Sequence, residues 1–213
     1  MSIDKIKVLL VDDHAMVRNG VRMMLSSADD ICVLAEAEST EAALKLVIEK
    51  DFDVALVDIS MPGKNGLELL KILKQQKPKL AVLMLSMYAE EVYAVRALKL
   101  GAAGYLSKNS SEASLVDAVR KAAAGGKYVS ASLVEQFADM LGGASAASHE
   151  ALSDRELEVL KLIASGESLV NIGLLLHLSP STVTTYRARI LEKMGMKSNA
   201  ELTRYASSTG LVN

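Results

Sequence analysis

The sequence predicts an α/β domain with a doubly wound, five-stranded parallel sheet, followed by an all-α domain of four helices that contains a helix-turn-helix. Five short apolar runs recur at wide spacing, and the segments between them place apolar residues at helical intervals. The runs lack the alternation of half-exposed strands, as expected where helices cover both faces of a sheet. This succession of strands and helices favours parallel pairing, and the later segments carry helix signals only.

Length and composition agree with two domains. The chain has 213 residues, of which 50% are hydrophobic. The lone Cys32 cannot form an internal disulfide and lies in an apolar run, so we expect a packed thiol in a reducing compartment. Lys5 and Lys7 interrupt the first apolar pieces, and no run of about 18 apolar residues occurs. We therefore expect a cytoplasmic protein with no signal peptide and no membrane partner.

Charge is distributed unevenly along the chain. The formal net charge is −2, which by itself does not point to nucleic acid. Between Glu150 and Leu175 five acidic residues face two basic ones, whereas from Leu176 onward five basic residues face two acidic ones. The last part of the chain therefore carries a local positive field.

The elements of the first domain can be placed in order. Strands are predicted at residues 8–11, 32–37, 54–57, 81–85 and 104–106. Helices are expected to begin at Ser39 and Asn65, and further helices to span Ala89 to Leu100 and Ser111 to Ala124.

The alternation of strands and helices ends at Gly125 and Gly126. Residues 128–141 predict one more helix, which packs on the first domain or acts as a stalk, and residues 142–148 have the small residues of a flexible linker. We place the first domain at residues 1–126, the linker helix and flexible linker at 127–149, and the second domain at 150–213.

The second domain carries four helix signals. Residues 153–156 form a capping box ahead of a helix at 157–164, with Gly166 as the stop, and Ser168 is expected to cap residues 170–176. Ser179 with Pro180 at the first helical position starts a longer helix that ends at Gly195. A second capping box at residues 198–201 opens the last helix toward Ser207. Two short helices joined by residues 177–179 form a helix-turn-helix pattern.

Carboxylates stand at the ends of two predicted strands. Asp12 and Asp13 end the first strand and Asp58 ends the third, just before a Pro62-Gly63 turn. In a parallel sheet these ends meet at one edge, where the mutual repulsion of three carboxylates is relieved by a hard divalent cation such as Mg²⁺. His14 follows the acidic pair, but imidazole is a poor partner for hard oxygen ligands, so we expect a structural or surface role.

A hydroxyl and an ammonium are predicted at the same edge. Ser86 ends the fourth strand and Lys108 follows the fifth. This set suits a phosphoryl group, because the metal and Lys108 neutralise its oxygens, Ser86 donates a hydrogen bond and a carboxylate accepts the group. A single aspartate at a strand end is more often a turn or cap residue. The joint occurrence of these residues favours the phosphoryl site.

These residues resemble the receiver domain of CheY-like response regulators over about the first 125 residues. The resemblance implies that Asp58 accepts phosphate from a sensor histidine kinase. It implies direct Mg²⁺ ligation by Asp13, Asp58 and the Ser60 carbonyl, with Asp12 acting through water. Ser86 and Tyr105 would form the switch pair. The matching residues are Asp12-Asp13, Asp58, Met61-Pro62-Gly63, Gly66, Ser86 and Gly104 to Lys108.

Residues 150 to about 208 resemble the LuxR/NarL-type helix-turn-helix. The resemblance rests on residues 152–160, Gly166, Ile172, the Leu178-Ser179 and Thr182-Val183 pairs, and residues 193–195. Together the two parts resemble a NarL/FixJ-type response regulator, which implies phosphorylation-controlled binding to double-stranded DNA and a homodimer on DNA. The helix at 180–194 would be the recognition helix in the major groove.

The faces of this helix follow from spacing. Val183, Ile190, Leu191 and Met194 form the apolar side. The candidate DNA contacts are Thr182, Thr184, Thr185 and Ala188, with Arg187, Arg189 and Lys193 placed for phosphate or guanine.

The chain departs from the family pattern at two places. Thr184 stands where the family often has lysine, and Leu169-Val170-Asn171 stands where Asn-Lys-Glu is common. Losing a lysine predicts weaker non-specific affinity and more dependence on dimerisation.

Two alternatives remain at this point. An aspartyl-phosphate hydrolase would have an acid/base carboxylate two residues after the nucleophile, whereas this chain has Ser60. We therefore expect a phosphoryl acceptor with at most slow self-dephosphorylation rather than an enzyme. A phospho-regulated interaction adaptor whose helix-turn-helix does not bind DNA is the second alternative, since Thr184 replaces a lysine.

Overall fold

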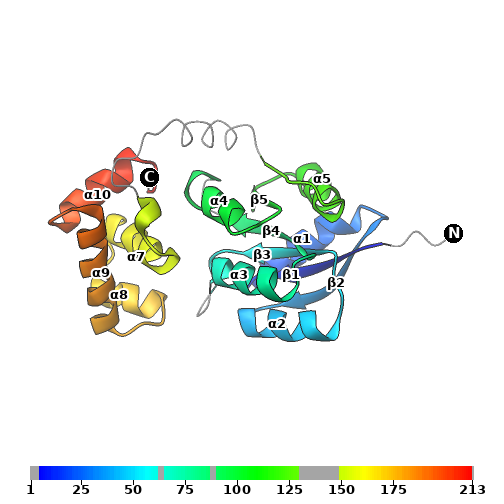
Figure 1. Ribbon diagram of the computed structural model, residues 1–213, viewed down its shortest axis with the longest axis horizontal. Coiled ribbons are helices and arrows are strands. Elements are labelled where there is room, and N and C mark those ends of the chain that lie inside the picture. Colours follow the sequence, from blue (N-terminus) through cyan, green and yellow to red (C-terminus); the bar gives the residue numbers. More distant parts are fainter. Residues whose placement is uncertain (1–4, 62–64, 87–89, 130–148, 213) are drawn as a thin grey trace. The chain divides into compact units, whose positions relative to one another are not determined.

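The computed structural model describes residues 5–61, 65–86, 90–129 and 149–212 (Figure 1). The chain divides into two compact units, residues 1–138 and 139–213. The domain limits predicted at residues 126 and 150 stay predictions, because residues 130–148 lie outside the described part. In the described part of the chain, no helix has the length and apolar character needed to cross a membrane.

The first unit contains the predicted five-stranded parallel sheet. The strand order is β2-β1-β3-β4-β5, and each neighbouring pair is parallel. Each strand is one or two residues longer than its apolar run, because residues flanking the run also join the ladder. The strands are β1 (Ile6–Val11), β2 (Ile31–Ala37), β3 (Val54–Asp58), β4 (Ala81–Ser86) and β5 (Gly104–Ser107).

Five helices cover the sheet. The helix starts predicted at Ser39 and Asn65 are confirmed, and these residues and Ser111 each accept a hydrogen bond from the backbone N–H three residues later. The face bearing Val8 and Leu56 packs against helices α1 and α5, while α2 and α3 lie together (Figure 1). The helices are α1 (Ala15–Ser26), α2 (Thr40–Glu49), α3 (Gly66–Gln76), α4 (Glu90–Lys99) and α5 (Glu112–Ala123).

The second unit is the predicted four-helix domain. Its core contains Leu157, Ile172, Val183, Ile190 and Leu202, each fully buried. Ser153 and Glu156 form the predicted capping box, and the αL conformation of Gly195 ends the long helix. A short 3₁₀ helix η1 (His149–Ala151) precedes α7 (Asp154–Ala164), α8 (Leu169–Leu175), α9 (Pro180–Met194) and α10 (Asn199–Ser208).

Three sequence predictions are corrected. Cys32 is exposed rather than packed, because β2 is an edge strand whose burial alternates. Glu201 does not complete a capping box, since its carboxylate accepts from the Lys197 N–H at 2.8 Å instead of from Ser198. Tyr128 does not start a helix: it bridges to Gly104 beside β5. The remainder of that predicted helix, from residue 130, falls outside the described residues.

Candidate functional site

The carboxyl ends of β1 and β3 bring two buried carboxylates together. Val11 pairs with Val57 in the sheet, so Asp12 and Asp58 follow at neighbouring positions, exposed by 0% and 1%. Lys108 lies between them. Its Nζ is 2.6 Å from Asp12 Oδ2 and 2.9 Å from Asp58 Oδ2, and its side chain is 6% exposed. The structure thus joins three of the sequence-predicted site residues directly.

Burial and charge act against each other in this cluster. Burial raises the pKa of Asp58, and Asp12 adds to the rise, while contacts from Lys108 and the Ser60 backbone oppose it. Burial alone would lower the pKa of Lys108, but its contacts with Asp12 and Asp58 outweigh burial and raise it. Lys108 therefore stays charged, and its single ammonium offsets only part of the charge of the two buried carboxylates.

The same edge offers oxygen ligands for a cation. One ligand atom each from Asp12, Asp13, His14 and Asp58 lies within 4.8 Å of the others. Asp12 Oδ2, Asp13 Oδ1 and Asp58 Oδ2 are buried atoms. Asp12 Oδ2 and Asp58 Oδ2 contact the Lys108 ammonium, and Asp13 Oδ1 lies 2.9 Å from Nδ1 of the exposed His14. Such a donor set fits a hard divalent cation.

The segment after Asp58 is held close by a glycine. Gly66 donates its N–H to Ile59 O at 3.0 Å, and a Cβ at this position would lie 1.9 Å from the Asp58 carbonyl oxygen. Asn65, 2% exposed, caps α3 immediately before it. Ser60 is exposed, and its predicted role as a carbonyl ligand stays a prediction.

Ser86 ends β4, and Tyr105 lies in the neighbouring strand β5. Both are fully buried, and the Ser86 carbonyl accepts from the Lys108 backbone N–H at 2.8 Å. Tyr105 pairs in register with Met84, two residues before Ser86. The backbone thus connects Ser86 to Lys108, while the predicted switch role of the Ser86 and Tyr105 pair remains a prediction.

In the second unit, α9 presents most of the predicted DNA contacts to solvent. Thr184, Thr185, Ala188, Arg189 and Lys193 are exposed, and Thr182 and Arg187 are half-buried. The opposite side is confirmed as apolar, since Val183, Ile190 and Met194 are buried. A hollow of about 270 Å³ on the exposed side is lined by Ser181, Thr182, Thr185, Tyr186 and Arg189.

Several of these side chains already have partners. Thr184 and Thr185 donate their hydroxyls to Pro180 O and Ser181 O, one turn back. Arg187 Nε donates to Asn199 Oδ1 at 2.6 Å, and Lys193 Nζ to Glu156 Oε2 at 2.6 Å. No pattern in the sequence pointed to these two contacts, which connect α9 to α10 and α7.

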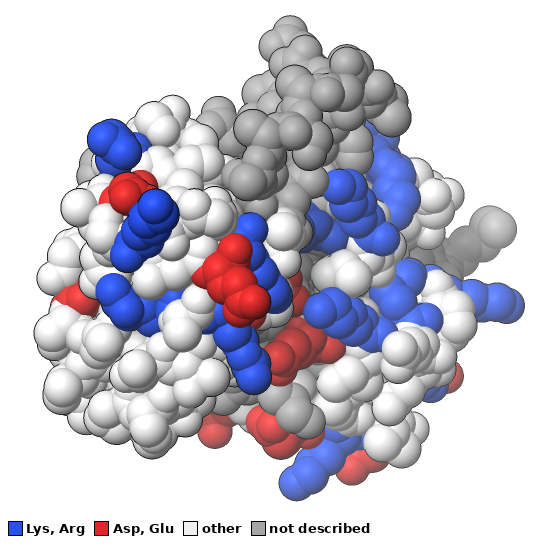
Figure 2. Space-filling view, turned by 60° about the vertical axis from the view of Figure 1, so that its left-hand side comes forward, with Lys and Arg blue, Asp and Glu red and all other residues white. Residues whose placement is uncertain are grey.

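Arg189 is the cation of α9 that is left free. It makes no hydrogen bond or ion pair with any described residue. On the face shown in Figure 2, basic and acidic side chains are interspersed and form no continuous positive surface.

Comparisons with known proteins match both units. Residues 8–120 match the response regulator receiver domain, and residues 150–206 match the bacterial regulatory proteins of the luxR family. The chain is 37% identical over 212 residues to response regulator GacA of Pseudomonas aeruginosa, covering 98% of each protein. It is 35% identical over 210 residues to response regulator UvrY of Escherichia coli, covering 98% of this chain and 96% of UvrY.

Solved structures of RcsB from Salmonella resemble the whole chain. One RcsB structure gives a TM-score of 0.71 at 26% identity and covers 97% of this chain and 98% of RcsB. RcsB bound to the rprA promoter in the presence of the phosphomimetic BeF3⁻ gives a TM-score of 0.67 at 26% identity, covering 95% and 98% of the two chains.

Proposed function

The chain belongs to the response regulators that join a receiver domain to a LuxR-family DNA-binding domain, and from this premise we propose that phosphorylation of Asp58 controls transcription through α9. The observation that carries the proposal is the buried contact of Lys108 with both Asp12 and Asp58. This arrangement places a nucleophilic carboxylate beside a fixed cation at the open edge of a sheet.

The proposed phosphodonor is a phosphohistidine of a sensor histidine kinase. An Asp58 carboxylate oxygen attacks the phosphorus, a P–O bond forms and the P–N bond breaks. The electron pair stays on the imidazole nitrogen, which then takes up a proton. Lys108, 2.9 Å from Asp58 Oδ2, neutralises the transferred oxygens.

A magnesium ion fits the remaining oxygens of this edge. We propose Asp13, Asp58 and the Ser60 carbonyl as direct ligands, with Asp12 acting through water. The support is that Asp12, Asp13 and Asp58 each place a buried oxygen in one cluster, with ligand atoms within 4.8 Å of one another. When bound, Mg²⁺ would supply further neutralisation of the phosphoryl oxygens.

The phosphoryl group then acts as a signal rather than as a reaction intermediate. Ser60, two residues after Asp58, offers no acid/base carboxylate, so we propose at most slow self-dephosphorylation. The added charge would draw the Ser86 hydroxyl toward the phosphate, with Tyr105 repositioning behind it. Both residues are buried, so a change at one must be accommodated by its neighbours.

The proposed output is binding of a homodimer to double-stranded DNA. The exposed side of α9 would enter the major groove, with Arg189 as its free cation. RcsB is known in a complex with promoter DNA in the presence of a phosphomimetic, which supports the same coupling here. The alternative of an adaptor that does not bind DNA is not favoured, since residues 150–206 match the luxR family.

The direct test is labelling by a small phosphodonor such as acetyl phosphate in the presence of Mg²⁺. Asp58→Asn should abolish the gain of one phosphoryl mass in the intact protein. Asp51→Asn is the matched control, because Asp51 is 96% exposed and precedes the same strand. Undiminished labelling of Asp58→Asn would exclude Asp58 as the acceptor.

A further inference from the structure

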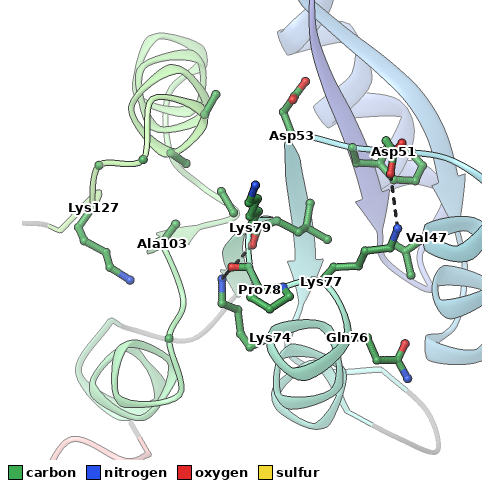
Figure 3. A pocket seen from close by; sticks show the side chains of 18 of the residues that line it. Val47, Asp51, Asp53, Lys74, Gln76, Lys77, Pro78, Lys79, Ala103 and Lys127 are labelled. Carbon is green, nitrogen blue, oxygen red and sulfur yellow. Dashed lines mark hydrogen bonds and ion pairs between the residues drawn. The ribbon is translucent and has the colours of Figure 1, made fainter.

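A cavity of about 690 Å³ lies in the first unit, at the edge of the sheet away from Asp58 (Figure 3). Asp53, Ala81 and Ala103, at the amino ends of β3, β4 and β5, line it. Because β3 has five residues, the cavity is about 15 Å from Asp58 at ~3.3 Å per residue. Its volume falls within the range of small-molecule sites.

Lysines dominate the charged lining of this cavity. They come from the end of α2, from α3 and its C-cap, from the loop before β4 and from the segment after α5. The two acidic residues of the lining are engaged: Asp51 pairs with Lys77 at 3.4 Å, and Asp53 Oδ2 accepts from the Lys7 N–H at 2.8 Å. The lining lysines are Lys50, Lys74, Lys77, Lys79 and Lys127.

Two of the ammonium groups are fixed by carbonyl oxygens. Lys74 Nζ donates to Pro78 O and Leu80 O, each at 3.0 Å, and Lys127 Nζ donates to Ala102 O. An ammonium has three N–H donors, so each lysine keeps at least one for a ligand. Figure 3 shows the two side chains reaching toward one another from α3 and from the segment after α5.

The neighbouring ammonium groups are unfavourable without an anion. Burial, and then the charge of Lys127, lower the pKa of Lys74. A negative group placed between the two lysines would relieve this repulsion. Two carbonyl contacts keep the Lys74 ammonium in position at little further entropic cost on binding.

Helix termini do not account for all of these lysines. Cations stabilise helix C-termini, and Lys74 lies in the last turn of α3. The last-turn cations of α5, however, are Arg120 and Lys121, and neither lines the cavity. Lys79 and Lys127 lie in loops. Position at a helix C-terminus therefore does not explain why Lys79 and Lys127 line the same cavity.

We propose that this cavity binds a polyphosphate chain, either free or as part of a nucleotide, through Lys74, Lys79 and Lys127. A single phosphate would fill little of the space, whereas a chain of phosphates can reach lysines that come from separate elements. The apolar part of the lining, which includes Val47 and Leu80, leaves room for a base or sugar.

The test uses the isotope-labelled full-length protein without Mg²⁺, with amide NMR shifts followed around Lys79, Gly101 and Lys127. Inorganic tripolyphosphate and ATP are titrated separately. Saturable shifts with both ligands support a site for the phosphate chain. Shifts with tripolyphosphate alone identify a free polyphosphate as the ligand, and shifts with ATP alone identify a nucleotide. The absence of saturable shifts in both titrations would overturn the proposal.

Matched variants separate this site from general charge attraction. Lys79→Gln/Lys127→Gln removes two of the three proposed ligand lysines and should weaken binding about tenfold, equivalent to about 1.4 kcal/mol. Lys45→Gln/Lys121→Gln removes the same charge from exposed lysines outside the cavity and should leave binding unchanged. Equal weakening by both double variants would overturn the proposal. Thermal melts establish that each variant is folded.

Discussion

The ammonium of Lys193, near the end of α9, lies 2.6 Å from Oε2 of Glu156 in the first turn of α7. The Glu156 carboxylate is buried and also accepts from the Ser153 N–H at 2.6 Å. Burial alone would raise the pKa of Glu156, but the hydrogen bonds from Lys193 and Ser153 hold it below its ordinary value. Lys193 therefore supports the position of α9 as well as being a candidate DNA contact.

We expect Lys193→Met to destabilise the second unit by about 1–2 kcal/mol, because a buried carboxylate loses one donor. Urea unfolding followed by NMR signals of the second unit measures this loss. A depressed pKa adds stability above the ordinary value of 4.5, and this stability disappears as the pH falls through the depressed pKa. The effect of Lys193→Met should therefore shrink in acid, and a pH-independent loss would contradict the ion pair.

Arg189→Ala should weaken DNA binding without changing stability, since Arg189 is exposed and contacts no described residue. We expect the slope of log K against log salt to fall by about 1 if Arg189 meets a phosphate. Arg204→Ala, an exposed arginine on α10, is the control and should keep the slope. An unchanged slope in Arg189→Ala would remove Arg189 from the interface.

Local signals in the sequence were enough to predict most of the fold. Apolar runs placed the five strands, and Ser or Asn before periodic segments placed the helix starts, because these patterns depend on neighbours within a few residues. The meeting of Asp12, Asp58 and Lys108 also followed from strand ends alone.

Contacts between distant residues could not be predicted in this way. Glu156 and Lys193 are 37 residues apart in the sequence. The sequence pattern around each residue suggested a different role, a helix cap for Glu156 and a DNA contact for Lys193, so their pairing was not predicted. The exposure of Cys32 depends on β2 being the edge strand, which no local pattern specifies. The lysine cavity likewise assembles residues from four separate segments.

Asp58→Asn should stabilise the metal-free protein at neutral pH. Because the pKa of Asp58 is raised by folding, its contribution to stability is fully present below the ordinary pKa of 3.8. This contribution is lost as the pH rises through the raised pKa. Ionised Asp58 thus costs stability at neutral pH, and asparagine removes this cost. In thermal melts measured at several pH values, the melting temperatures of Asp58→Asn and the wild-type protein should become equal in acid. At neutral pH, Mg²⁺ should reduce the difference in melting temperature between the two proteins, because it stabilises the protein with ionised Asp58. Lower stability of Asp58→Asn without metal would contradict the burial argument.

Gly66→Ala should disturb the phosphorylation site through packing alone. A methyl group at this position would lie 1.9 Å from the Asp58 carbonyl oxygen and 2.9 Å from Ile59 Cα, so the segment after Asp58 must shift. We expect a loss of about 1–3 kcal/mol in the free energy of unfolding, with slower labelling by acetyl phosphate. Gly20→Ala is the matched control, because a Cβ at Gly20, inside α1, meets nothing within 4 Å. It should leave labelling intact and stabilise α1 by about 0.5–1 kcal/mol. Normal stability and labelling in Gly66→Ala would show that the loop can move away at no cost, and that Gly66 does not position Asp58.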